Sequence, residues 1–237
     1  MSASTGAITT SASVYTTGAF WERLWRTGGI QFVAISIISA VIYGNQPQIG
    51  ASPEELTAFY DGHRVRILIA VAFSGLNLLN LLWFAAALRT ALADAGRDGW
   101  GAAATVASAV FGGLSLLLFA VVAALAHSIA TGNPTLASGL NAFAWALVVL
   151  TAFPRAMLIM SGVFGLWRAG LISNALFSAG VLAVVLGVLG GTTWMRGGFW
   201  APDGVYSRFV MPVLLLVWVI AVSRVLNTRN AAARAGW

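Results

Sequence analysis

The chain contains no cysteine and few charged residues, and both shortages limit what it can be. Without cysteine there are no disulfides, no thiolate catalysis, no iron–sulfur clusters and no cysteine-based zinc sites. Charged residues make up only 8% of the 237 residues, whereas soluble domains carry about 25%. Because 59% of the residues are hydrophobic, the composition excludes an ordinary soluble domain and predicts an integral membrane protein.

Lysine is absent as well, so all 13 basic residues are arginine. The net charge of +6 would suit a nucleic-acid partner, but the arginines are scattered along the chain and form no basic patch. The excess of arginine in the cytoplasmic loops of membrane proteins explains this charge better. We therefore expect no nucleic acid among the partners.

Six long apolar stretches predict an all-α fold, a bundle of six transmembrane helices. A helix needs about 20 mostly apolar residues to cross a bilayer. The stretches that qualify are roughly residues 28–44, 65–88, 101–130, 139–167, 171–194 and 207–226. Pro154 lies inside the fourth stretch and predicts a kink there.

The placement of the arginines predicts the orientation of the bundle. With the N-terminus inside, eight arginines fall on the cytoplasmic side (Arg23, Arg26, Arg89, Arg97, Arg168, Arg224, Arg229 and Arg234) and four fall outside (Arg64, Arg66, Arg196 and Arg208). We therefore predict a multi-pass protein with both termini cytoplasmic. Its arginine-only, Ala- and Gly-rich composition suggests a GC-rich bacterial genome, hence the bacterial inner (plasma) membrane. Around the transmembrane domain, 28–226, we expect a disordered cytoplasmic tail (1–19), an interfacial segment (20–27) and a cytoplasmic tail (227–237).

Arg155 is the residue that the membrane interpretation leaves unexplained, because no predicted span contains an Asp or Glu. An arginine at the centre of a spanning helix costs roughly 2.5 to 3.5 kcal/mol. Asn77 and Asn80 share one face of the second span at a comparable depth, and their oxygens can accept hydrogen bonds from a guanidinium. These three residues predict a buried anion site for a lipid phosphate or a substrate carboxylate. The alternative is structural: Arg155 ties helices together through amides and carbonyls, or extends to the cytoplasmic surface.

The outer loops hold a second group of candidates. Ser52 and Glu55 have the spacing of a capping box, which predicts a short helix over about 53–60. Beyond it, Asp61, His63 and Asp203 are candidates for acid–base chemistry in an outward-facing pocket. The alternative is a lid in which salt bridges such as Asp61–Arg208 or Asp203–Arg64 hold the two loops together.

His63 and His127 are the only histidines. A zinc site usually needs at least three protein ligands, so we expect neither a metal nor a cofactor. Small residues spaced four apart, as in Gly187 and Gly191, allow helices to approach closely and leave a homo-oligomer open.

Three stretches carry a resemblance to a known group: 52–60, with Ser-Pro-Glu-Glu-Leu followed by Phe-Tyr; 63–66, His-Arg-Val-Arg; and 82–89, Leu-Trp-Phe-Ala-Ala-Ala-Leu-Arg. With them, most of the chain after residue 20 resembles small actinobacterial multi-pass membrane proteins of unknown function. The resemblance implies the class of protein and supplies no catalytic residues.

The sequence therefore favours a non-enzymatic membrane protein that binds a lipid, a small amphipathic ligand or a membrane-protein partner, with Arg155 and the face of Asn77 and Asn80 as its polar centre. The alternative is a membrane-embedded enzyme that acts on a lipid or an isoprenoid at the outer face. A small transporter is the third possibility. It would need a continuous polar path through the bundle, and a single buried charge provides little of one.

Overall fold

The computed structural model describes residues 27–129 and 134–235, and its regular structure in this part of the chain is entirely helical. The helices are α2 (Gly28–Tyr43), α3 (Pro53–Tyr60), α4 (Arg64–Asp94), α5 (Asp98–Ser128), α6 (Pro134–Leu150), α7 (Ala152–Arg168), α8 (Asn174–Gly190), a π-helical turn η2 (Tyr206–Val210) and α9 (Met211–Ala235). The all-α prediction is confirmed. The predicted tail over 1–19 and nearly all of the interfacial segment over 20–27 lie outside the described residues.

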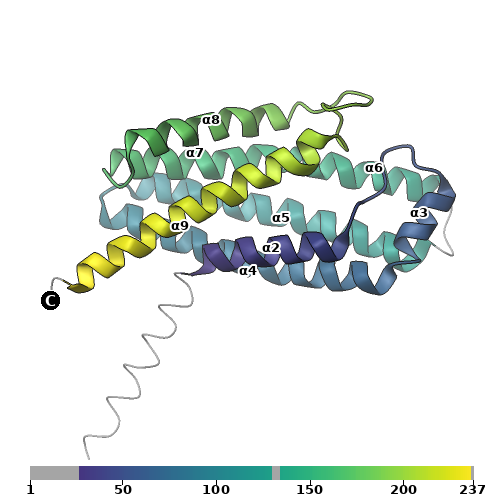
Figure 1. The fold of residues 1–237 in the computed structure, drawn as a ribbon, viewed down its shortest axis with the longest axis horizontal. Coiled ribbons are helices and arrows are strands. Elements are labelled where there is room, and N and C mark those ends of the chain that lie inside the picture. The colour runs from purple at the N-terminus through teal and green to yellow at the C-terminus, as the bar shows by residue number, and fades with distance from the viewer. Residues whose placement is uncertain (1–26, 130–133, 236–237) are drawn as a thin grey trace, which may run out of the picture.

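The long helices run side by side, so the bundle has two ends (Figure 1). The short helix α3 covers one end, which we call the α3 end (Figure 1). The opposite end, which we call the C-terminal end, carries the turns between α4 and α5 and between α7 and α8 and the end of α9 (Figure 1).

Four helical segments are long and apolar enough to cross a membrane: Arg64–Asp94, Asp98–Ser128, Leu136–Arg168 and Tyr206–Thr228. The apolar helices α2 and α8 are shorter, with 16 and 17 residues. Many large apolar side chains point away from the bundle, among them Val41, which is 77% exposed, and Leu76, which is 66% exposed. A surface this apolar fits lipid and not water, so the chain has the construction of a membrane protein.

The fourth predicted span is interrupted where the sequence predicts a kink. A turn at Thr151 separates α6 from α7, three residues before Pro154. Proline has no N–H to donate to the carbonyl four residues earlier, so the helical ladder is broken at this point. The interruption places Arg155 in the first turn of α7.

The start of α3 agrees with the local sequence pattern, whereas the end of α9 differs from the predicted boundary. The capping box of α3 is confirmed: the Ser52 hydroxyl accepts from the backbone N–H of Glu55, and the Glu55 carboxylate accepts from the N–H of Ser52. The last helix, α9, runs to Ala235, past the predicted end of the sixth span at residue 226. Part of the predicted tail over 227–237 is therefore helical.

Helices α2 and α9 lie close together at one point and diverge from it. A Cβ atom added to Gly29 would meet the Ser223 hydroxyl and would lie 3.2 Å from a Val219 methyl, so only glycine fits where α2 meets α9. Toward the α3 end the two helices separate, with α5 behind them (Figure 1). This divergence creates the cavity described next.

Candidate functional site

A cavity of about 700 Å³ occupies the space between α2 and α9. Helix α5 contributes Phe111, Leu118, Phe119 and Val122 to its lining, and the other lining residues come from α2 and the loop after it, from α4, α6, α7 and η2, and from the start of α9. Most of the lining is apolar, and two arginines, Arg155 and Arg208, belong to it. No Asp or Glu is found among the described residues that line it. The volume is within the range of about 300 to 1,000 Å³ that is typical of ligand pockets.

The guanidinium of Arg155 has few protein partners in this cavity. Its Nη2 donates to the Thr151 hydroxyl at 2.7 Å, and its Cζ lies 5.0 Å from the centre of the Phe111 ring. Its Nε and Nη1 atoms are buried and have no hydrogen-bond partner among the described residues. These two atoms carry most of the five N–H donors of the side chain. Among the described residues, protein groups therefore bind one of the three guanidinium nitrogens and leave the other two without an acceptor.

Arg155 extends toward the α3 end of its helix. Side chains on a helix lean toward its N-terminus, and Thr151 lies one turn in that direction from Arg155. Arg168, at the C-terminal end of α7, is thirteen residues away in the opposite direction. In the structure Arg155 therefore extends away from the C-terminal end of the bundle.

Asn77 and Asn80 lie together but do not bind Arg155. The side-chain amide of Asn77 donates to the Phe32 carbonyl and to the Ser36 hydroxyl, both at 2.9 Å, and its oxygen accepts from Asn80 at 3.2 Å. The pair thus joins α4 to α2, and neither asparagine lines the cavity. The expectation that these amides accept from the guanidinium is not met, because the second span turns this face toward α2.

Arg208 is the functional candidate that the sequence interpretation missed. It lies on the π-helical turn η2, where its Nη2 donates to the Gln46 carbonyl at 3.1 Å and its Cζ lies 4.9 Å from the centre of the Trp145 ring. Its Nε is buried without a hydrogen-bond partner among the described residues. π-Helical turns occur often at functional sites. One sequence signal could have identified Arg208: it lies at the start of an apolar span that contains no Asp or Glu to pair with it.

A buried polar network holds the rim of the cavity. The Asn141 oxygen accepts from the Tyr60 hydroxyl at 2.8 Å and from the Gln46 amide at 3.2 Å. The Asn141 amide donates to the carbonyls of Pro47 and Gln48 at 3.3 and 3.1 Å. Burial raises the pKa of Tyr60, so its hydroxyl keeps the proton that it donates. Asn141 therefore fixes the loop over 44–51 to α3 and α6.

The three acid–base candidates occupy separate places at the α3 end. The Asp203 carboxylate accepts from the backbone N–H of Ile49 at 2.9 Å, and it joins two loops that are far apart in sequence. The His63 ring lies 3.2 Å from the Ala58 carbonyl. Asp61 is exposed, and none of the three candidates lines the cavity between α2 and α9.

The two expected salt bridges do not form in the structure. Arg208 binds the Gln46 carbonyl instead of Asp61, and the Arg64 guanidinium contacts the His127 ring at 2.8 Å instead of Asp203. The loops are nevertheless joined, because Asp203 accepts from the backbone of Ile49. The two loops are therefore in contact, as the lid alternative expects. A hydrogen bond from the backbone joins them in place of the two salt bridges.

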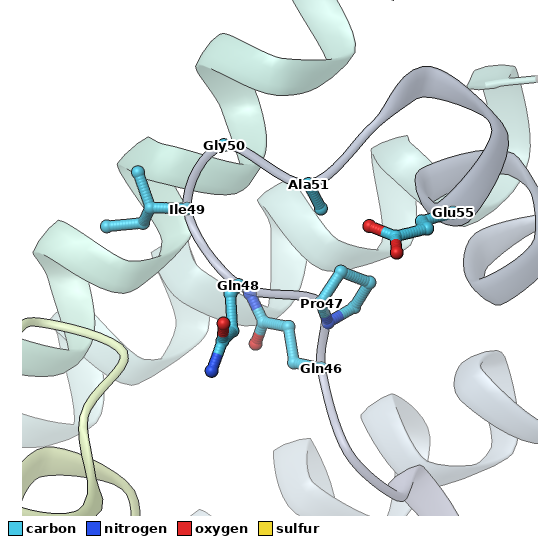
Figure 2. Close-up of a pocket in the computed structure, with 7 residues that line it drawn as sticks. All are labelled: Gln46, Pro47, Gln48, Ile49, Gly50, Ala51 and Glu55. Carbon is cyan, nitrogen blue, oxygen red and sulfur yellow. The ribbon is translucent and has the colours of Figure 1, made fainter. Parts of the chain in front are cut away.

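A second cavity, of about 460 Å³, lies beside the loop over 46–51 (Figure 2). Glu55 is the only charged residue among the described residues that line it. Its carboxylate already accepts from the N–H of Ser52 in the capping box. This cavity thus offers no unpartnered charge to a ligand, unlike the one between α2 and α9.

Comparisons with known proteins do not add a function. No protein-family model matches the chain, no curated protein matches it, and no solved structure matches it. The candidate for function is therefore the cavity between α2 and α9 with its two arginines.

Proposed function

We propose that this chain is a six-span protein of the bacterial cell membrane, with both termini in the cytoplasm, that binds an anionic amphipathic molecule between α2 and α9. Arg155 would hold the anionic group. The apolar walls would hold the hydrocarbon part. In this proposal α2 and α8 are the two additional spans, short enough to cross only with local thinning of the bilayer.

The single observation that carries the proposal is the open guanidinium of Arg155. A buried charge is stable only when it is paired and hydrogen-bonded. Here the Nε and Nη1 atoms face no protein acceptor among the described residues, and no acid lines the cavity. A bound carboxylate or phosphate would supply both the acceptors and the missing charge.

The surroundings of Arg155 support a ligand that comes from the lipid phase. Where α2 and α9 diverge, Ala40 on α2 and Val213 on α9 both line the cavity and are both exposed. In a membrane-spanning bundle, an opening between these two helices would face the lipid and not the aqueous phase. Arg155 is close to the last turn of α8, since a Cβ on Gly187 would lie 3.2 Å from the Ala156 Cβ. With the C-terminal end in the cytoplasm, the anion would lie in the outer half of the bilayer.

Filling the cavity should remove the ligand. Ala40 lines it, so we expect Ala40→Trp to reduce the retention of phosphatidylglycerol at least tenfold relative to the wild type, because the indole occupies part of the space that the acyl chain needs. Native mass spectrometry of protein purified in a neutral detergent, with phosphatidylglycerol or phosphatidylcholine added, measures this. The wild type should retain the anionic lipid in preference to the zwitterionic one.

The matched control is Ala34→Trp on the same helix. Ala34 is also exposed but does not line the cavity, so this variant should retain phosphatidylglycerol as the wild type does. Equal retention by the Ala40→Trp and Ala34→Trp variants would refute the assignment of the cavity. Equal retention of the two lipids by the wild type would refute the proposed function itself.

A further inference from the structure

The cavity carries a second cation at the opposite end from Arg155. Arg155 and Phe111 line the part nearer the C-terminal end of the bundle, whereas Arg208 lines the part nearer the α3 end, with Tyr43 and Gln46. Both arginines have buried nitrogen atoms without a hydrogen-bond partner among the described residues. Among the described residues, the cavity therefore has two positively charged side chains in its lining and no negatively charged one.

The charge of the ligand should match this pair of cations. A carboxylate or a phosphodiester carries one negative charge, so it would leave one of the two arginines uncompensated in an apolar cavity. A phosphomonoester carries about −1.5 to −2 at neutral pH, because its second pKa is about 6. Opposite charges attract over several ångströms at the low effective permittivity of such a site, so the anionic group need not touch both guanidinium groups.

We propose that the ligand is a phosphomonoester or diphosphate of a long apolar alcohol or diacylglycerol, and that Arg208 selects this dianionic class over monoanionic lipids. This inference rests on the proposed function and deepens it. Arg155 binds the anionic group in either class. Arg208 supplies the second positive charge that a monoanion cannot use.

The contacts of Arg208 suit this role. Only its Nη2 atom is used by the Gln46 carbonyl, and the flat guanidinium lies beside the Trp145 ring. Nε is the atom left without a partner, so protein groups leave much of the charge of Arg208 available to the cavity while the loop contact stays in place. Arg208 thus holds the cavity rim and faces the ligand at the same time.

The test compares phosphatidate with phosphatidylglycerol of the same acyl chains, each added to the purified full-length protein, with retention measured by native mass spectrometry. At about pH 7.5 we expect the wild type to prefer phosphatidate roughly tenfold. The Arg208→Gln variant should lose this preference and still retain phosphatidylglycerol. At about pH 5, where the phosphomonoester loses its second charge, the preference of the wild type should also disappear.

Two further variants control for charge and for folding. Arg196→Gln removes one positive charge from the loop between α8 and η2, but Arg196 is exposed and does not line the cavity, so the preference should remain. Arg208→Lys keeps the charge and should keep most of the preference. A preference that survives in Arg208→Gln, or that is lost equally in Arg196→Gln, would overturn the role of Arg208.

The remaining outcomes separate this inference from the proposed function. If the wild type retains both anionic lipids equally and more strongly than phosphatidylcholine, the dianion inference fails and the proposed function stands. If it retains neither anionic lipid above phosphatidylcholine, both fail. Inorganic phosphate is the competitor that tests the source of the anion. If inorganic phosphate at millimolar concentration displaces phosphatidate, the site is assigned to free phosphate and the lipid assignment is overturned.

Discussion

Replacing Arg155 with methionine should reduce the retention of anionic lipid roughly 30-fold or more and should not destabilise the protein. The loss follows because the cation supplies the charge and the donors for the anionic group. The unchanged or higher stability follows because two of the three guanidinium nitrogens have no protein partner among the described residues. Replacing buried charges with apolar groups is often neutral or stabilising by about 1 to 4 kcal/mol. Thermal unfolding without added lipid and native mass spectrometry with phosphatidylglycerol measure the two effects.

This pair of measurements separates a binding residue from a structural one. If Arg155 ties the helices together, Arg155→Met should lower the melting temperature in the absence of lipid. The control is Arg196→Met, an exposed position outside the cavity, which should change neither quantity. A large loss of stability in Arg155→Met with unchanged lipid retention would contradict the proposed role.

The Asn141→Leu variant should lose roughly 3 to 5 kcal/mol of stability, because a buried polar group left without its partner costs about 1 to 3 kcal/mol. Leucine has a similar volume but leaves the Tyr60 hydroxyl, the Gln46 amide and two backbone carbonyls without this partner. For a chain of this length we expect the melting temperature to fall by roughly 10 °C. Thermal unfolding in detergent checks this value.

Asn174→Leu is the matched control for this prediction. The Asn174 oxygen accepts one hydrogen bond, from the Trp167 indole at 3.0 Å, and both residues are exposed. Its loss should cost less than about 1 kcal/mol, since water replaces an exposed partner. Similar destabilisation of the two variants would show that the rim network around Asn141 contributes no more than a surface contact.

The helices could be predicted from the sequence because their signals are local. An apolar stretch of about 20 residues marks a span whatever it packs against. The capping box of Ser52 and Glu55 and the helix interruption before Pro154 depend on residues within one turn. The resemblance to actinobacterial membrane proteins stays a prediction, as does the six-span topology.

The partners of the buried polar groups could not be predicted because they depend on how each helix is rotated. In this chain the faces toward lipid and toward the bundle are both apolar, so the hydrophobic pattern does not fix the rotation. Asn77 therefore turned out to face α2, and Arg155 to face Phe111. Arg155 and Arg208 line the same cavity because α2 and α9 diverge. This divergence depends on how several helices pack, so it cannot be predicted from the sequence of one segment.

An experimental structure of the protein in nanodiscs that contain an anionic lipid tests the central claim most directly. We predict density for an anionic group between α2 and α9, with an oxygen about 2.7 to 3.2 Å from Nε or Nη1 of Arg155. A hydrocarbon chain should follow the apolar wall formed by α5. A structure in which α2 and α9 close the cavity, and protein groups take all the donors of Arg155, would contradict the account.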